Sequence, residues 1–287
     1  MRRLLAALPA LACALLALPA GADEPGKLTL PARRQVEEKV PVTVTDPATG
    51  ATKTVYESRS KAVEAAVAID PAKTAVVVCD MWDDHWCKSA SARCGELAKK
   101  AEPVLKACRD RGMTVIHCPS DTMAFYKDHP ARTRVARVKK ASPPKAKDLP
   151  SPPLPVDDSD GGCDDEKPAK PFKAWTRQHA AVTIDDDKDY ITDNGGEAYS
   201  ILKEKGIDTL LVMGVHTNMC VLNRSFAIKQ MVKWDVRTLL VRDLTDAMYN
   251  PKMKPLVSHD RGTQLIVEHI ERHWCPTIES KSLVGTK

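Results

Sequence analysis

The sequence predicts an α/β fold of three layers, in which a doubly wound, mainly parallel sheet lies between two layers of helices. Two observations lead to this prediction. Apolar runs of strand length alternate along the chain with segments of helical periodicity. These runs are also almost continuously apolar, which is typical of parallel strands that are buried on both faces.

Five strands are expected, at residues 74–80, 113–118, 189–192, 209–215 and 236–241. The third is the weakest, because residues 181–184 compete for the assignment. Helical patterns occupy residues 96–109, 197–205, 220–232 and 262–274. We expect the strand order 3-2-1-4-5, with room for a sixth strand. Ligands of such sheets bind at the carboxyl ends of the strands, where the order reverses.

The chain begins with a pattern typical of a secretory signal peptide. Arg2 and Arg3 precede an apolar run over residues 4–19, and Ala20-Gly21-Ala22 forms a small-residue cleavage site. We therefore expect residues 1–22 to be removed. The apolar run is too short to span a membrane, so the mature protein is expected to be secreted or periplasmic and not anchored in the membrane.

The mature chain divides into an extension and one main domain. In the extension, residues 23–65, two Thr- and Val-rich runs flank residues 46–50 and predict a β-hairpin. The main domain covers residues 66–280. It contains an insertion, residues 139–171, that holds eight of the 21 prolines. We expect a long surface loop there, since strand and helix patterns of the same type continue on both sides.

Charge and cysteine content limit the classes of partner and the compartment. Removal of Arg2 and Arg3 leaves 41 of the 43 basic residues against 38 acidic ones, a net charge of +3. Such a balanced chain is not expected to bind nucleic acid or an anionic membrane. Export permits disulfides, for which the candidates in polar or irregular surroundings are Cys87, Cys94, Cys163 and Cys275.

Cys220 is the candidate nucleophile. It follows the strand at residues 209–215 and the turn His216-Thr217-Asn218-Met219, at the start of a helical pattern. Free N–H groups and the positive end of the helix dipole lower a thiol pKa from about 8.5 at such a position, which favours the thiolate. The alternative interpretation is a small buried side chain at a strand–helix junction. Asp80 closes the first strand, and the expected order places it beside Cys220.

These two motifs resemble the isochorismatase-like cysteine hydrolases. Residues 76–81, Val-Val-Val-Cys-Asp-Met, are similar to the family's first-strand motif, and residues 206–221 contain its Gly-Val-x-Thr-x-x-Cys-Val core. The resemblance implies that Cys220 is the nucleophile, that Asp80 is its base, and that a cis peptide precedes His216. The backbone N–H groups of His216 and Cys220 would form the oxyanion hole. A small-molecule substrate and a homo-oligomer are also implied.

The third catalytic position departs from the family's pattern. The family has a Lys that closes the third strand, and this chain has Asp193 there. Arg177 and Lys188 are the nearby cations that we consider as substitutes. Without a cation in the cleft, the thiolate would lack a charge partner and Asp80 would tend to keep its proton.

Three residues are expected to line the substrate pocket, namely Trp82, His117 and Thr217. Alternatives stay open for two of them, since Trp82 could equally cover the core and a strand-end histidine such as His117 is more often hydrogen-bonded within the protein. Asp83, Asp84 and His85 are metal-ligand types, but no second ligand set has suitable spacing. We therefore expect neither a metal nor a cofactor.

The sequence thus favours an exported hydrolase that cleaves a small amide, carbamoyl or related C–N bond through Cys220 and Asp80. The alternative is a non-catalytic binding or scaffold protein on the same fold, which the missing Lys and the Pro-rich insertion favour. A cation within hydrogen-bonding reach of Cys220 distinguishes the two hypotheses.

Overall fold

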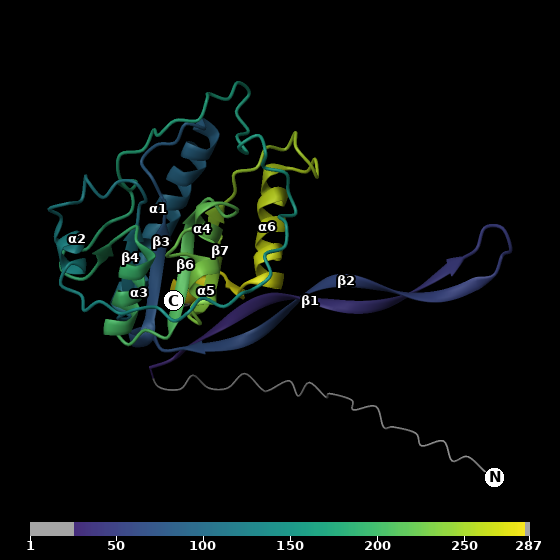
Figure 1. The fold of residues 1–287 in the computed structure, drawn as a ribbon, viewed down its shortest axis with the longest axis horizontal. Helices are drawn as coiled ribbons and strands as arrows, with labels where there is room; N and C mark the ends of the chain where they lie inside the picture. The colour runs from purple at the N-terminus through teal and green to yellow at the C-terminus, as the bar shows by residue number, and fades with distance from the viewer. Residues whose placement is uncertain (1–25, 285–287) are drawn as a thin grey trace, which may run out of the picture.

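The computed structural model describes residues 26–284 (Figure 1). The predicted signal peptide, residues 1–22, lies outside the described residues. One eight-stranded sheet with helices on both faces forms the body of the protein, and a long hairpin projects from it. Within residues 26–284, no helix is both long and apolar enough to span a membrane.

The sheet has the predicted strand order. Its strands are β1 (Leu28–Thr45), β2 (Thr52–Ile69), β3 (Thr74–Cys79), β4 (Thr114–Cys118), β5 (Tyr190–Ile191), β6 (Thr209–Val215), β7 (Arg237–Asp246) and β8 (Thr277–Ile278), in the order β2-β1-β8-β7-β6-β3-β4-β5. Neighbouring strands from β5 to β8 are parallel. The expected 3-2-1-4-5 order corresponds to β5-β4-β3-β6-β7, and β8 is the sixth strand. Residues 181–184, which competed for the third strand, contain no strand.

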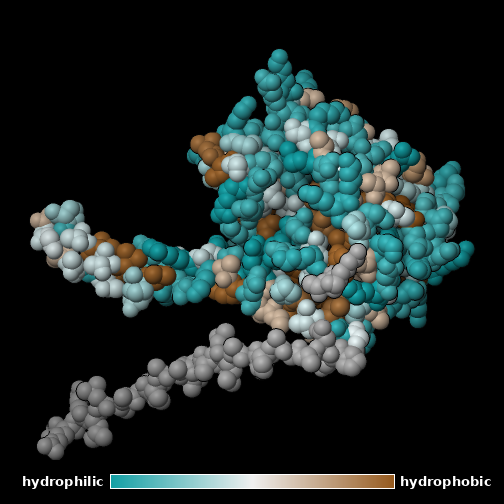
Figure 2. All heavy atoms as spheres, turned by 180° about the vertical axis from the view of Figure 1, so that it is seen from behind, coloured by the Kyte–Doolittle hydropathy of each residue, from teal (hydrophilic) through white to brown (hydrophobic). Residues whose placement is uncertain are grey.

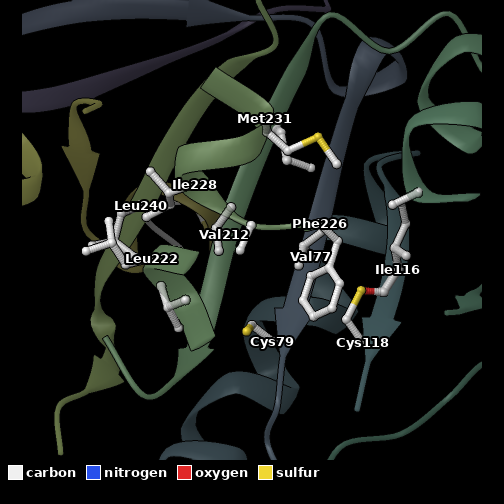
Figure 3. Packing of buried hydrophobic residues seen from close by; sticks show 14 of the residues in the cluster. Val77, Cys79, Ile116, Cys118, Val212, Leu222, Phe226, Ile228, Met231 and Leu240 are labelled. Atoms are coloured by element: carbon white, nitrogen blue, oxygen red, sulfur yellow. The ribbon is translucent and has the colours of Figure 1, made fainter. Parts of the chain in front are cut away.

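Helices cover both faces of the sheet. They are α1 (Lys88–Asp110), α2 (Pro130–Val135), α3 (Gly195–Glu204), α4 (Cys220–Asn223), α5 (Ile228–Lys233), α6 (His259–His273) and α7 (Lys281–Val284), with a 3-10 turn, η1 (Pro71–Lys73). Val77 of β3 packs in a core with α3 to α6, whereas its neighbour Val76 packs in a core with α1 and α7. Figure 3 shows part of the first core, where Phe226 points toward β3 and β4. Both faces of β3 are therefore buried, which accounts for its continuous apolar run.

Two helices differ from their predicted bounds. α1 begins at Lys88 and not at residue 96, because its first two turns consist of small and polar residues without apolar periodicity. The single helix predicted from Cys220 onward is wrong, since α4 and α5 are separate. Arg224, the C-cap of α4, has a ψ of 151° and is extended. Arg224 therefore lies at the end of α4 and not within a continuous helix.

The predicted β-hairpin is much longer than expected. β1 and β2 are each 18 residues long and pair antiparallel along their whole length. Their root joins the sheet where Arg33 pairs with Thr277 of β8. The predicted boundary between residues 65 and 66 therefore falls within β2. Residues 36–61, here called the arm, extend away from the body (Figure 1).

The Pro-rich insertion is attached to the body at several points. Residues 139–171 contain no helix or strand, but Val156 is buried and Leu154 packs against the core beneath α3 to α6. A disulfide joins Cys163 to Cys87, just before α1. The other two disulfide candidates, Cys94 and Cys275, are buried free thiols. The insertion is thus a long surface loop, mostly exposed, that is fixed to the body near its middle.

Gly214 allows β6 to approach β3 closely. Its φ is +121°, and a Cβ atom there would lie 1.9 Å from the carbonyl oxygen of Cys79. We expect Gly214→Ala to lower the free energy of unfolding by about 3 kcal/mol, because the methyl group would displace one of the two strands. Chemical denaturation followed by circular dichroism measures this change.

Gly112→Ala is the matched control for this substitution. Gly112 also has a positive φ, +85°, but no atom lies within 4 Å of its added Cβ. Only the cost of the left-handed conformation remains, about 1 kcal/mol. Equal destabilisation by the two substitutions would contradict a steric role for Gly214.

Candidate active site

Asp80 and Cys220 meet at the carboxyl ends of two neighbouring strands. Asp80 directly follows β3, Cys220 begins α4 after β6, and β3 pairs with β6. The Asp80 carboxylate and the Cys220 thiol lie close enough that each shifts the pKa of the other. The structure therefore brings the predicted acid and thiol together at one edge of the sheet.

The Asp80 carboxylate is fully buried and is held from three sides. Besides the thiol, Oδ1 accepts a hydrogen bond from the N–H of Ser120 at 2.7 Å, and Oδ2 accepts one from Nε of Arg224 at 3.1 Å. Burial raises the pKa of Asp80, and the charge of Arg224 acts against that rise. The backbone of Asp80 is left-handed, with a φ of 47°. Non-glycine residues in this conformation occur disproportionately at functional sites.

Arg224 supplies the cation that the third catalytic position lacks. Its guanidinium donates a hydrogen bond to Asp80, its charge acts to lower the pKa of the Cys220 thiol, and Nη2 lies 3.4 Å from the Asp121 carboxylate. Asp193, where the resembled family has Lys, accepts a hydrogen bond from the N–H of Asp121 at 3.1 Å. The positive charge thus enters the site from the end of α4 and not from the third strand. Spacing could have revealed it, because residues four apart on a helix are neighbours.

The two cations that we considered as replacements for the family's Lys lie elsewhere, so both of these predictions were wrong. Nε of Arg177 is 3.7 Å from the Asp83 carboxylate. Lys188 is exposed, and its Nζ is 4.0 Å from Asp185. In the described chain, neither contacts the carboxylate–thiol pair. Both were chosen for closeness to the third strand along the chain, and closeness in sequence did not place them in the cleft.

The Cys220 thiol is protonated at neutral pH. Burial first, and then the Asp80 carboxylate, raise its pKa to about 12, whereas Arg224 acts to lower it. The sequence predicted a lowered pKa from the position at a helix start, and this was wrong. α4 spans only four residues, and its N-cap residue Met219 makes no side-chain cap hydrogen bond. A helix this short has little macrodipole to offset burial.

The turn before Cys220 leaves two N–H groups free. The peptide bond between Val215 and His216 is cis, as the family resemblance implies. The N–H of Thr217 donates to the carbonyl of Asp246 at 2.8 Å, whereas those of His216 and Cys220 donate to no acceptor within the described residues. These are the two donors that the sequence analysis assigned to an oxyanion hole. They are free to bind an oxygen that becomes negatively charged.

A pocket of about 450 Å³ opens beside Cys220. Its lining consists of Leu154, Asp158, Asn218, Met219, Cys220, Asn223 and Arg224. Two of these, Leu154 and Asp158, belong to the Pro-rich loop, which therefore forms one wall. Nδ2 of Asn218 donates to the Asp158 carboxylate at 2.7 Å and connects this wall to the turn before Cys220.

His117 and Thr217 do not line this pocket. The ring nitrogens of His117 lie 2.9 Å from Gln178 and 2.9 Å from Asp189, and the side chain is completely buried. The hydroxyls of Thr217 and Thr245 are hydrogen-bonded at 2.7 Å. The prediction that these two residues bind substrate was wrong, because their polar groups are satisfied inside the protein. For His117 the alternative interpretation is the correct one.

Trp82 belongs to an aromatic cluster beside the site and is absent from the pocket lining. Its ring stacks on that of Trp175, with the two centroids 4.1 Å apart. The ring of His85 also stacks on Trp175, with a centroid distance of 5.8 Å. The edge of His216 meets His85 at 5.0 Å. Burial lowers the pKa of His216 to about 3, so its ring is neutral. The cluster therefore packs a neutral His216 ring against His85 beside the turn at residues 216–219.

The metal-ligand types near the site have other partners. Asp83 accepts hydrogen bonds from Thr176, and the Asp84 carboxylate is 3.0 Å from Nζ of Lys88. The side chains of Cys87, Cys163 and Asp165 also come together. Because the two cysteines form a disulfide, they offer no thiolate to a metal ion.

Fold and site together define an α/β protein with a cysteine–aspartate–arginine centre at the carboxyl edge of its sheet. The chain is similar to a cysteine hydrolase from Pseudomonas syringae pv. phaseolicola, with 17% identity, a TM-score of 0.46, and coverage of 75% of this chain and 92% of that one. It is also similar to an isochorismatase family protein from Burkholderia thailandensis, with 14% identity, a TM-score of 0.43 and coverage of 76% and 98%. An isochorismatase from Pseudomonas putida matches with 11% identity, a TM-score of 0.43 and coverage of 74% and 90%. No protein-family profile and no curated protein sequence matches the chain.

The raised pKa of Cys220 predicts slow alkylation near neutral pH. Labelling by iodoacetamide, read from the mass of the Cys220 peptide, should still increase above about pH 10, because only the thiolate reacts. Arg224→Gln should shift the labelling curve to higher pH, since it removes a charge that favours the thiolate. Arg224→Lys is the control, and it should stay near the wild-type curve. A wild-type midpoint below the ordinary value of about 8.5 would show that the thiol is activated at rest.

Proposed function

We propose that the protein is an exported hydrolase that cleaves a small amide, carbamoyl or related C–N bond with Cys220 as the nucleophile. One observation carries the proposal, namely that the Cys220 thiol lies beside a pocket and next to a buried carboxylate that is hydrogen-bonded to a guanidinium. The pocket volume of about 450 Å³ lies within the range of small-molecule sites. The signal-peptide pattern supports secretion or a periplasmic location.

The first step couples attack to proton transfer. As Sγ of Cys220 bonds to the carbonyl carbon, the thiol proton passes to Asp80 and the π electrons of the carbonyl move to its oxygen. The raised pKa of Asp80 makes this carboxylate a stronger base than an exposed one. Arg224 donates to Asp80 and its charge favours the ionised form of Cys220, so it stabilises the carboxylate before the transfer and the negative charge that develops on sulfur during it.

The oxyanion is stabilised by the turn that precedes the nucleophile. The free N–H groups of His216 and Cys220 would bind it, and one such donor is typically worth about 3 kcal/mol in the transition state. Both donors are backbone groups at the end of β6, so their positions depend on the sheet and not on a mobile side chain.

Collapse of the tetrahedral intermediate breaks the C–N bond. The leaving nitrogen takes the proton from Asp80, and a thioester remains on Cys220. Asp80 then removes a proton from a water molecule that attacks the thioester. The Cys220 sulfur leaves and takes back this proton, which releases the acid product and restores the resting site.

Cys220→Ala should abolish any hydrolysis, because the nucleophile is lost. The measurement is turnover of a panel of small amides and carbamoyl compounds, followed by release of ammonia or amine. Cys108→Ala, which changes a buried free thiol in α1, is the control and should retain activity. Turnover by Cys220→Ala would rule out the mechanism. Binding of these compounds to both proteins without turnover would support a non-catalytic binding protein, which the protonated resting thiol favours.

The role of Arg224 predicts a charge requirement and a pH profile. Arg224→Gln should lower kcat/KM by about 100-fold, as expected when a charged hydrogen bond to a developing anion is lost. Attack requires ionised Asp80, whose pKa is raised above its ordinary value of 3.8. Activity should therefore fall as the pH decreases through that raised value.

Arg224→Lys is the matched control and should recover much of the activity, because a cation remains. In Arg224→Gln the acidic limb of the pH profile should move to higher pH, since the charge that opposed the rise is gone. An unchanged limb in Arg224→Gln would show that Arg224 does not act through Asp80.

A further inference from the structure

The arm, residues 36–61, has no layer packed on either of its faces. Within it, Val40, Val42 and Val55 are half-buried, and every other residue is exposed. Its strands of about ten residues reach roughly 33 Å at 3.3 Å per residue. A two-stranded hairpin is at best marginally stable by itself in water. A surface that covers one face would stabilise it.

One face of the arm carries an apolar stripe. Residues paired across a hairpin share a face, and Val42 pairs with Val55. Since alternate residues of a strand also share a face, the stripe consists of Val36, Val40, Val42, Val44 and Val55. Val36 and Val44 are 40% and 39% exposed. We call this surface the valine face, and Figure 2 shows apolar residues along the arm.

The root holds the arm in a defined direction. Leu30 and Ala32, which continue the alternation of the valine face, are buried in the core with α1 and α7. On the opposite face, the buried carboxylate of Glu271 in α6 accepts hydrogen bonds from Arg33 at 2.7 Å and Gln35 at 2.8 Å. The arm therefore extends from an anchored base.

A groove lies beside this root. It has a volume of about 310 Å³, and Arg34 and Val67 line it from the hairpin while Val232, Val236 and Trp274 line it from the body. Val67 pairs with Leu30, so it lies on the same side of the hairpin as the valine face. Asp235 and Arg237 also line it, so the groove offers apolar side chains between charges of both signs to a face that has the same mixture.

Charges on the arm favour a second copy of the chain over a partner of one charge sign. On the valine face, Lys61 is 3.3 Å from Glu38 and Arg59 is 3.2 Å from Glu57. Because both signs alternate there, neither an acidic nor a basic partner would be matched. A surface with both signs can match itself about a twofold axis.

Interface area indicates how two copies would meet. One face of the arm, roughly 33 Å by 10 Å for two strands, offers about 330 Å². Two arms stacked only on each other would bury about 660 Å², which is in the range of crystal contacts. If instead the arm of each copy lies on the body of the other copy, there are two such contacts. Together they would bury about 1,300 Å², which reaches the size of a stable interface.

We propose that the protein forms a twofold dimer in which the valine face of each arm packs into the root groove of the other copy. The two contacts are equivalent, so the assembly closes at two chains. This inference is independent of the proposed reaction.

Sedimentation velocity over a range of protein concentrations tests the proposal. The wild-type protein should be a dimer. Val42→Glu combined with Val55→Glu should raise the dimer dissociation constant by about 100-fold or more, because apolar contacts in both arms are lost. Val236→Glu, which changes the groove and leaves the arm intact, should weaken the dimer in the same way.

Thr43→Glu combined with Thr54→Glu is the matched control. These residues pair with each other next to Val42 and Val55, but on the opposite face, and both are exposed. This variant should remain a dimer. A wild-type monomer at all concentrations, a dimer that survives the valine-face substitutions, or equal dissociation of the control would overturn the proposal. Circular dichroism of each variant shows that the body remains folded.

Discussion

A carboxylate that is removed from water needs a counter-charge, and Asp80 obtains it from Arg224. The arrangement at this edge of the sheet follows from that need. The extended backbone that ends α4 places the guanidinium against both Asp80 and the thiol. The N–H of Ser120 after β4 binds the remaining carboxylate oxygen. Three strand ends thus contribute to one buried charge.

The same ion pair distinguishes resting and reacting states. The Cys220 thiol at rest is neutral, since burial and a neighbouring anion both oppose its ionisation. A neutral thiol is less susceptible to oxidation and to adventitious electrophiles than a thiolate. Ionisation would then occur only as substrate accepts the sulfur. The charge on Arg224 is shared throughout, so the site does not have to expose a free anion.

Continuous apolar strands allowed the topology, and with it the contact of Asp80 with Cys220, to be predicted from sequence. Arg224 was missed because only cations near the third strand were considered, although its spacing of four residues from Cys220 was a usable signal. The wall formed by Leu154 and Asp158 could not be predicted, since a Pro-rich loop without periodicity contains no signal for its position. The reach of the arm was underestimated for a related reason. No layer packs on either face of the arm, so burial does not require an alternation of apolar and polar residues along its strands.

The disulfide between Cys87 and Cys163 makes one pocket wall dependent on the surroundings in which the chain folds. It joins residues separated by 76 positions. In the chain-entropy model, closing a loop of this length stabilises the folded state by roughly 4 to 5 kcal/mol, because it restricts the unfolded chain. A reducing compartment withholds this link. The loop that carries Leu154 and Asp158 would then be tied to the body by packing and hydrogen bonds alone. Completion of the pocket is therefore a chemical event as well as a folding event, because it requires an oxidising medium.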